Sequence, residues 1–151
     1  MNAIKYAETI KFYKKTAELQ VKLLKPEADE SGKIIKEGCI FFEMADAIPG
    51  DPEGRIDWRN KIIMKIGVND IGVLLNALKF DLPEAKLFHK TSTGTSTFQF
   101  AKGKNPGTYG VSLYKTLGEQ KLQSRMYLSS ADVMILEEIL RAGLPVILGW
   151  S

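Results

Sequence analysis

The sequence predicts an α+β fold in which a run of antiparallel strands is followed by one helix, and this arrangement occurs twice. Two observations predict it. Several stretches alternate apolar and polar side chains with a period of two, and each half of the chain ends in one stretch with helical spacing. The 151 residues fit one domain, 1–151, with halves of about 11–80 and 86–148 that share a pattern but no sequence identity.

Three extended stretches are expected in the first half. Residues 16–24 alternate cleanly, and Pro26 ends this strand. A second stretch covers 33–47, with a break near Gly38, and a third covers 57–66. In the third stretch the alternation places Trp58 in the core and the neighbouring cations on the opposite face.

A helix over residues 70–79 closes the first half. Asn69 can cap its N-terminus, and Pro83 marks the break after it. Its apolar stripe has helical spacing and consists of Ile71, Leu74, Leu75 and Leu78.

The second half repeats the arrangement. Its four expected strands cover residues 86–90, 95–102, 109–116 and 121–128. Ser129 and Asp132 have the spacing of a capping box and predict the start of the final helix. Gly143 and Pro145 predict its end.

Composition excludes several classes of protein. Hydrophobic residues make up 44% and charged residues 26%, as in globular domains. No apolar run approaches the roughly 20 residues that cross a bilayer, so no membrane partner is expected. The first residues lack the features of a signal or transit peptide. We therefore expect a cytoplasmic protein of a prokaryote or virus, or a mature organellar protein.

Positive charge is concentrated on the predicted polar faces of the strands, although the net charge is only +3. Glu18 is the one acid that the alternation places there. Such a face can track a phosphate backbone without the whole protein being strongly basic. Its cations are Lys14, Lys22, Arg59, Lys61, Lys65, Lys121 and Arg125.

Aromatic and further basic residues are interleaved with these cations. Aromatic rings on a sheet, beside cations, can stack on unpaired bases, which a duplex hides. The added candidates for nucleic-acid binding are Tyr13, Lys90, Phe98, Phe100, Lys102, Lys104, Tyr109, Tyr114 and Lys115. Two simpler explanations remain open: the lysines serve solubility, and Phe98 and Phe100 fill the core.

Six segments, in order, resemble the Whirly family of single-stranded DNA-binding proteins. Residues 13–19 stand where that family carries Lys-Gly-Lys-Ala-Ala-Leu. The others are the apolar segment 38–45, the Asp-Trp segment 57–61, the helix start 67–72, Phe88-His89, and the Leu-Pro-…-Gly-Trp segment 144–151. Thr16 and Glu18 depart from the first motif, which in the family supports assembly of larger particles, so such assembly is in doubt here.

The resemblance implies two antiparallel four-stranded sheets, each followed by a helix, in a tetramer around a helical hub. It implies sequence-independent binding of single-stranded DNA in replication, recombination or repair. The final helix has more apolar surface than a monomer is expected to bury, which predicts an oligomer interface at Val133, Leu136, Ile139 and Leu140.

Enzymatic chemistry is not expected. His89 is the only histidine, Cys39 the only cysteine, and residues 101–107 lack the ending of a phosphate-binding P-loop. We therefore expect no catalytic site, metal or cofactor. Two alternatives to DNA binding remain: an RNA-binding or RNA-annealing protein on the same scaffold, and a structural oligomer without a nucleic-acid function.

Overall fold

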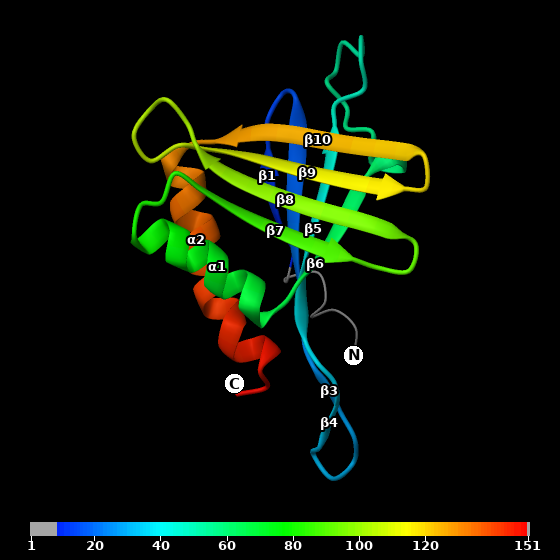
Figure 1. The fold of residues 1–151 in the computed structure, drawn as a ribbon, viewed down its shortest axis with the longest axis vertical. Coiled ribbons are helices and arrows are strands. Elements are labelled where there is room, and N and C mark those ends of the chain that lie inside the picture. Colours follow the sequence, from blue (N-terminus) through cyan, green and yellow to red (C-terminus); the bar gives the residue numbers. More distant parts are fainter. Residues whose placement is uncertain (1–8, 151) are drawn as a thin grey trace.

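The computed structural model describes residues 9–150, which form ten strands, two α-helices and one short 3₁₀ turn (Figure 1). The strands are β1 (Thr9–Tyr13), β2 (Ala17–Leu24), β3 (Glu27–Ala28), β4 (Ile34–Lys36), β5 (Cys39–Asp46), β6 (Ile62–Ile66), β7 (Glu84–Lys90), β8 (Gly94–Lys102), β9 (Tyr109–Leu117) and β10 (Gln120–Leu128). The 3₁₀ turn is Trp58–Asn60, and the helices are α1 (Val68–Lys79) and α2 (Ser130–Ile147).

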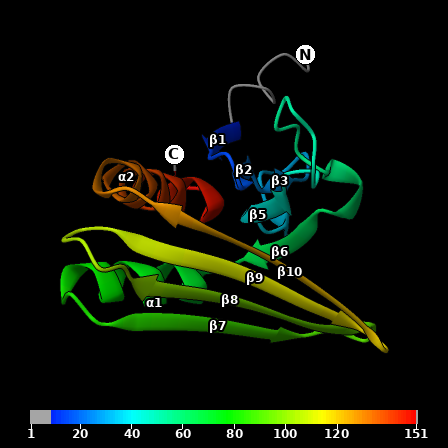
Figure 2. The ribbon, with the colours of Figure 1, turned by 90° about the horizontal axis from the view of Figure 1, so that it is seen from above.

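Eight of the strands form two antiparallel four-stranded sheets, and this confirms the predicted fold class. Sheet one has the order β1-β2-β5-β6, and sheet two has the order β10-β9-β8-β7. The strands of the two sheets cross in Figure 1, and Figure 2 shows the sheets as two layers. Strands β3 and β4 form a separate hairpin that projects from the molecule.

The first half differs from the sequence prediction in three places. Strand β1 was not predicted from the alternation pattern, and it pairs with β2 along its whole length. The stretch 33–47 divides at Glu37-Gly38, as predicted, but its first part, β4, belongs to the projecting hairpin, and only β5 joins sheet one. Residues 58–60 form a 3₁₀ turn, so the third strand begins only at Ile62.

The core lies between the facing surfaces of the two sheets. On sheet one it includes Leu19, Phe42 and Met64, and on sheet two it includes Phe98 and Leu113; each is at most 2% exposed. The rings of Phe42 and Phe98 meet across the layers, with centroids 4.9 Å apart. Ser124 Oγ also donates a hydrogen bond of 2.7 Å to Asp46 Oδ1, which joins β10 to the end of β5.

The helix termini confirm one predicted cap and correct another. At the start of α2, Ser129 Oγ accepts from the Asp132 N–H at 3.1 Å, and the Asp132 carboxylate accepts from the Ser129 N–H at 2.9 Å. The N-cap of α1 is Gly67 rather than Asn69. Here the Asp70 carboxylate accepts from the Gly67 N–H at 2.9 Å, which satisfies one free donor of the first turn.

Helix α2 continues through both residues that were expected to stop it. Gly143 is buried, and a Cβ placed on it would lie 3.1 Å from Ile40 Cδ1, so its small size allows the helix to approach sheet one closely. Pro145 lies in the last turn, and Ile147 beyond it is buried. Tertiary packing of this end of the helix therefore outweighs the helix-stopping tendency of the two residues.

Candidate nucleic-acid interface

The outer surface of sheet two faces away from the core and is not covered by another element (Figures 1 and 2). Its side chains follow from the strand alternation and the register. We call this surface the outer face. It consists of Glu84, Lys86, Phe88 and Lys90 on β7, Thr95, Thr97, Gln99 and Ala101 on β8, Gly110, Ser112, Tyr114 and Thr116 on β9, and Lys121, Gln123, Arg125 and Tyr127 on β10.

The register arranges these side chains in four rows that run across the sheet. Two rows have a cation at each end and polar side chains between, and the other two rows carry the aromatic rings. The rows are Tyr127–Gly110–Ala101–Glu84, Arg125–Ser112–Gln99–Lys86, Gln123–Tyr114–Thr97–Phe88 and Lys121–Thr116–Thr95–Lys90. Successive rows are two residues apart along each strand, or roughly 7 Å. The row with Tyr114 and Phe88 thus lies between two rows that end in cations.

The outer face has an excess of positive charge. Lys86, Lys90, Lys121 and Arg125 are exposed, and in residues 9–150 none of them forms an ion pair. Glu84 is the single acid on this face, and its carboxylate accepts a hydrogen bond of 3.0 Å from Gln99 Nε2. These cations are therefore available to neutralise phosphates.

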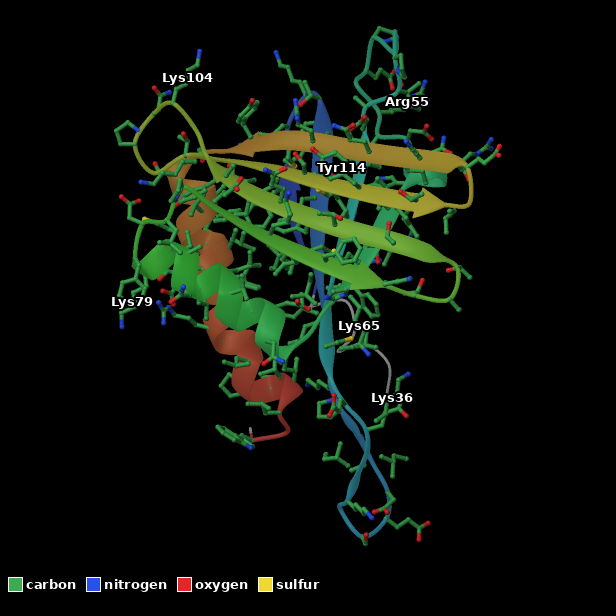
Figure 3. All side chains as sticks on the ribbon, in the orientation of Figure 1. Lys36, Arg55, Lys65, Lys79, Lys104 and Tyr114 are labelled. Carbon is green, nitrogen blue, oxygen red and sulfur yellow. The ribbon has the colours of Figure 1, made fainter. Side chains whose placement is uncertain are left out.

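Three aromatic rings are open to solvent on the same face. Phe88 is 61% exposed and Tyr127 66% exposed, while Tyr114 is half-buried at the centre of the sheet, on the side turned to the viewer in Figure 3. The side chains between them are mostly hydroxyl or amide groups, which can donate and accept hydrogen bonds. This combination of rings, cations and small polar groups suits unpaired bases joined by phosphates.

The exposed surface of sheet one is electrostatically different. Glu43 is buried on β5 and forms ion pairs with Lys22 Nζ at 3.2 Å and Lys61 Nζ at 3.0 Å. Two cations that the sequence assigned to the basic face are therefore already paired within the chain. Lys65 remains exposed on β6, next to the half-buried Phe41 in the register.

A groove runs along the edge of sheet two, where β10 meets the turn between β1 and β2. One section of about 490 Å³ is lined by residues that include Lys14, Lys104 and Tyr127. A second section of about 730 Å³ is lined by residues that include Lys15, Arg125 and again Tyr127. Lys104 lies in the exposed loop between β8 and β9, as labelled in Figure 3. The groove therefore extends the basic surface around the β10 edge.

Lys14 also has a structural contact in this groove. Its Nζ lies 2.7 Å from Asp132 Oδ2 at the start of α2. Burial alone would raise the pKa of Asp132, but the hydrogen bond from Lys14 and those from Ser129 outweigh it and lower the pKa below the ordinary 3.8. Lys14 therefore fixes the β1–β2 turn against the N-terminus of α2.

Five residues of β8 and β9 that were predicted to bind nucleic acid do not lie on the outer face of these strands. The predicted exposure of the Phe98, Phe100 and Tyr109 rings is wrong, because they are at most 4% exposed and belong to the core. Phe100 and Tyr109 stack with ring centroids 4.2 Å apart, and burial raises the pKa of Tyr109. Lys102 forms an ion pair of 2.7 Å with Asp81, and the half-buried Lys115 lies on the opposite side of β9.

The structure separates the other predicted binding residues into three places. Lys90, Tyr114, Lys121 and Arg125 share the outer face, and Lys14 and Lys104 line the groove. The rest lie on or beside sheet one: Tyr13, Lys22, Arg59, Lys61 and Lys65. Among these, the hydroxyl of Tyr13 donates to the Gly54 carbonyl at 3.3 Å, so it also holds the loop before the 3₁₀ turn.

The set of binding residues predicted from the sequence leaves out three residues of the outer face: Lys86, Phe88 and Tyr127. The signal was present for β7, where Lys86, Phe88 and Lys90 alternate with Ala85 and Leu87. In β8 the residues Thr95, Thr97 and Gln99 form a uniformly polar side, which implies that Phe98 and Phe100 face inward.

The predicted oligomer interface also requires correction. Val133, Leu136 and Leu140 are at most 6% exposed, because they pack into the core of their own chain, and Ile139 is partly buried. The same helix exposes other apolar side chains, Met134 (71%) and Ile135 (51%). Any contact between chains through α2 therefore uses a different side of the helix from the one predicted.

Further features of the described residues bear on other functions. Neither helix within 9–150 combines the length and apolar character needed to cross a membrane. Over the same range no three His, Cys, Asp or Glu side chains are grouped so as to hold a metal ion. His89 Nε2 lies 2.9 Å from Asp70 Oδ2, which links β7 to the start of α1. Burial raises the pKa of the Cys39 thiol, although Lys65 and Lys36 act in the opposite direction.

Comparison with known proteins identifies a family. The sequence profile of the Whirly transcription factor family matches residues 12–136. Comparison with curated proteins finds no sequence match. The fold is similar to that of WHY1 from Arabidopsis thaliana, with a TM-score of 0.80 and 20% identity over 94% of this chain and 91% of WHY1.

Two other solved structures share the fold. One is the plant transcriptional regulator PBF-2, with a TM-score of 0.77, 20% identity, and coverage of 94% of this chain and 82% of that one. The other is a guide-RNA-binding protein complex bound to a guide RNA, with a TM-score of 0.54, 9% identity, and coverage of 86% and 92%. At identities of 20% or less, the similarity to these structures is a similarity of fold.

Proposed function

The chain belongs to the Whirly family, and we propose that it binds single-stranded DNA, without sequence preference, along the outer face of sheet two. Whirly proteins are a non-enzymatic family that binds single-stranded nucleic acids. The observation that carries the proposal is the combination of exposed Phe88 and Tyr127 and half-buried Tyr114 with four cations that have no acidic partner within residues 9–150.

Binding on this face uses two kinds of contact. Lysine and arginine side chains at the ends of the rows neutralise phosphates and release counterions, which gives affinity without sequence information. Aromatic rings stack on base faces, and each such contact contributes about 1–3 kcal/mol. A duplex hides its base faces, so the stacking contribution is available only to unpaired strands. We infer that the protein protects or presents single strands during replication, recombination or repair.

We also propose that the protein acts as a homotetramer assembled through its helices. The support is apolar surface that remains on both: Val73 on α1, Phe80 just beyond it, and Met134 and Ile135 on α2 are at least 42% exposed. The two helices pack against each other beside sheet two (Figure 1). Several sheets in one assembly add their contacts to the same strand through effective concentration.

The test compares the affinities of the protein for single-stranded DNA, duplex DNA and single-stranded RNA of matched sequence and length. The proposal predicts the tightest binding to single-stranded DNA at every salt concentration. Tighter binding to RNA would establish the RNA-binding alternative, because the 2′-hydroxyl is the difference between the two strands. If the protein binds none of the three at low salt, the remaining explanation is a structural oligomer without a nucleic-acid function.

A further inference from the structure

Tyr127 on β10 has an unusual neighbour across the sheet. Its register partner on β9 is Gly110, and a Cβ atom placed on Gly110 would lie 3.2 Å from Tyr127 Cε1 and 3.5 Å from Cδ1. The tyrosine ring therefore lies over the glycine backbone, while 66% of the residue remains exposed. The absence of a side chain at position 110 leaves the space that the ring occupies.

The backbone of Gly110 gives no other reason for a glycine. Strand β9 lies inside the sheet between β8 and β10, where glycine weakens a strand and often marks a close approach. Gly110 does not have the positive φ that several other glycines of this chain have. Its next neighbour in the same row is the small Ala101. Small residues at both positions give the ring a flat support.

The ring also lies at a junction between two surfaces. Tyr127 belongs to the outer face, and it lines both sections of the groove at the β10 edge. Lys14 and Lys104 line one of these sections, and Lys15 and Arg125 line the other. A base on the Tyr127 ring would therefore have cations in both adjoining groove sections, where its flanking phosphates can reach them.

We propose that Tyr127, positioned by Gly110, is a stacking subsite for one unpaired base, at the point where a bound strand passes from the outer face into the groove. The proposal rests on the proposed function, since it specifies where one base of the strand binds. Tyr127 contacts the base in this arrangement, whereas Gly110 is a positioning residue that acts through the ring.

The first experiment removes the aromatic ring from the protein and, separately, the bases from the oligonucleotide. Tyr127→Ala lowers the affinity for single-stranded oligo-dT by roughly 5- to 150-fold, and Tyr127→Phe restores it because the ring is retained. With an abasic oligonucleotide of the same length, Tyr127→Ala and the unmodified protein bind equally. The dependence of affinity on salt keeps its slope in Tyr127→Ala, because no phosphate contact is lost.

The second experiment tests the role of Gly110 through a double-mutant cycle. Gly110→Ala lowers the affinity for oligo-dT when Tyr127 is present and has no further effect in the Tyr127→Ala protein. An equal loss in both backgrounds would overturn the positioning role, because Gly110 would then act independently of the ring. Gly72→Ala is the matched control, since that glycine on α1 has open space around it.

The outcomes separate this proposal from the proposed function. If the unmodified protein binds oligo-dT and Tyr127→Ala binds it equally well, the subsite is wrong and the wider function stands. An equal loss on normal and abasic strands would also overturn the subsite, because the effect would then not concern a base. If the unmodified protein binds no single strand, the proposed function itself fails.

Discussion

At the scale of single residues, burial decides which aromatic side chains can contact a base. Phe88 and Phe98 lie on paired neighbouring strands and differ by one position in the register, since Phe88 is opposite Thr97 and Phe98 is opposite Leu87. Phe88 is nevertheless 61% exposed, whereas Phe98 is fully buried against Phe42. The period-two alternation of β7 and β8 produces this difference. Phe88 is therefore available to contact a base, whereas Phe98 contributes to the stability of the fold.

Phe88→Ala is expected to weaken binding of single-stranded DNA, with a loss corresponding to about 1–3 kcal/mol, and to leave the unfolding midpoint nearly unchanged. Phe98→Ala is expected to lower the free energy of unfolding by about 3–5 kcal/mol, because it leaves a cavity between the sheets. Urea denaturation and DNA titration of both variants check this pair. A stable Phe98→Ala protein that has lost only its binding would contradict the assignment of the faces.

Charged residues also differ in whether they can contact the nucleic acid, because some already have an acidic partner within residues 9–150 and others do not. Arg125→Gln is expected to reduce the slope of log affinity against log salt by roughly 0.7, the value for one phosphate contact to a single strand. Lys22→Gln is the matched control, because Lys22 is paired with the buried Glu43. Binding titrations at several salt concentrations measure both slopes. A larger effect of Lys22→Gln would place the strand on sheet one instead.

Asp132 provides a prediction about pH. Its pKa is lowered in the folded protein, so it stabilises the fold above its ordinary pKa of 3.8, and this contribution is lost as the pH falls below that value. Asp132→Asn is therefore expected to be less stable than the unmodified protein at pH 7, by about 1 kcal/mol, given the exposure of the Lys14 pair. Urea denaturation between pH 7 and pH 3 should show the difference shrinking toward the acidic end. A constant difference would show that the charge of Asp132 is unimportant.

At the scale of elements, local patterns predicted what short-range interactions determine. The Ser129–Asp132 capping box and the strands of sheet two follow from neighbouring residues, and they are present in the structure. Long-range packing determined the features that were missed. Strand β1 has only five residues and is held by pairing with β2, and α2 continues through Gly143 because that residue packs against Ile40.

The candidate site shows the same limit. Alternation identified a polar side for several strands, but it did not reveal that Glu43 is buried and paired with Lys22 and Lys61. Nor did it show which residues of β9 and β10 are opposite each other, and hence that Tyr127 lies over Gly110. Both facts depend on the strand order and register, which a single sequence does not specify.

Helix α2 yields a prediction about assembly. Replacing the exposed Met134 and Ile135 together with glutamate is expected to reduce the proposed tetramer to monomers that remain folded. Leu136→Glu is expected to unfold the chain instead, since Leu136 is 1% exposed within its own core. Light scattering gives the mass of each variant, and circular dichroism shows whether it is folded. An intact tetramer after the double replacement would exclude this side of α2 from the interface.

At the scale of the whole molecule, the fold divides its two sheets between different tasks. Their inner surfaces form one shared core, which holds the sheets in fixed positions. The outer face of sheet two is then free to carry rings and cations that have no acidic partner among the described residues, while the cations of sheet one are partly neutralised by Glu43. A nearly neutral protein can in this way present one strongly positive surface to a strand.

The most direct test of this division is fluorescence anisotropy with a labelled oligo-dT of about 30 nucleotides, long enough to cover several sites. One variant replaces Lys86, Lys90, Lys121 and Arg125 with glutamine, and a control replaces three lysines of sheet one, Lys11, Lys22 and Lys65, with glutamine. We predict that the first variant loses most of its affinity and that its salt slope falls by up to about 3, whereas the control binds nearly as the unmodified protein does. Unchanged binding by the first variant, with loss in the control, would place the nucleic-acid interface on sheet one and contradict the account.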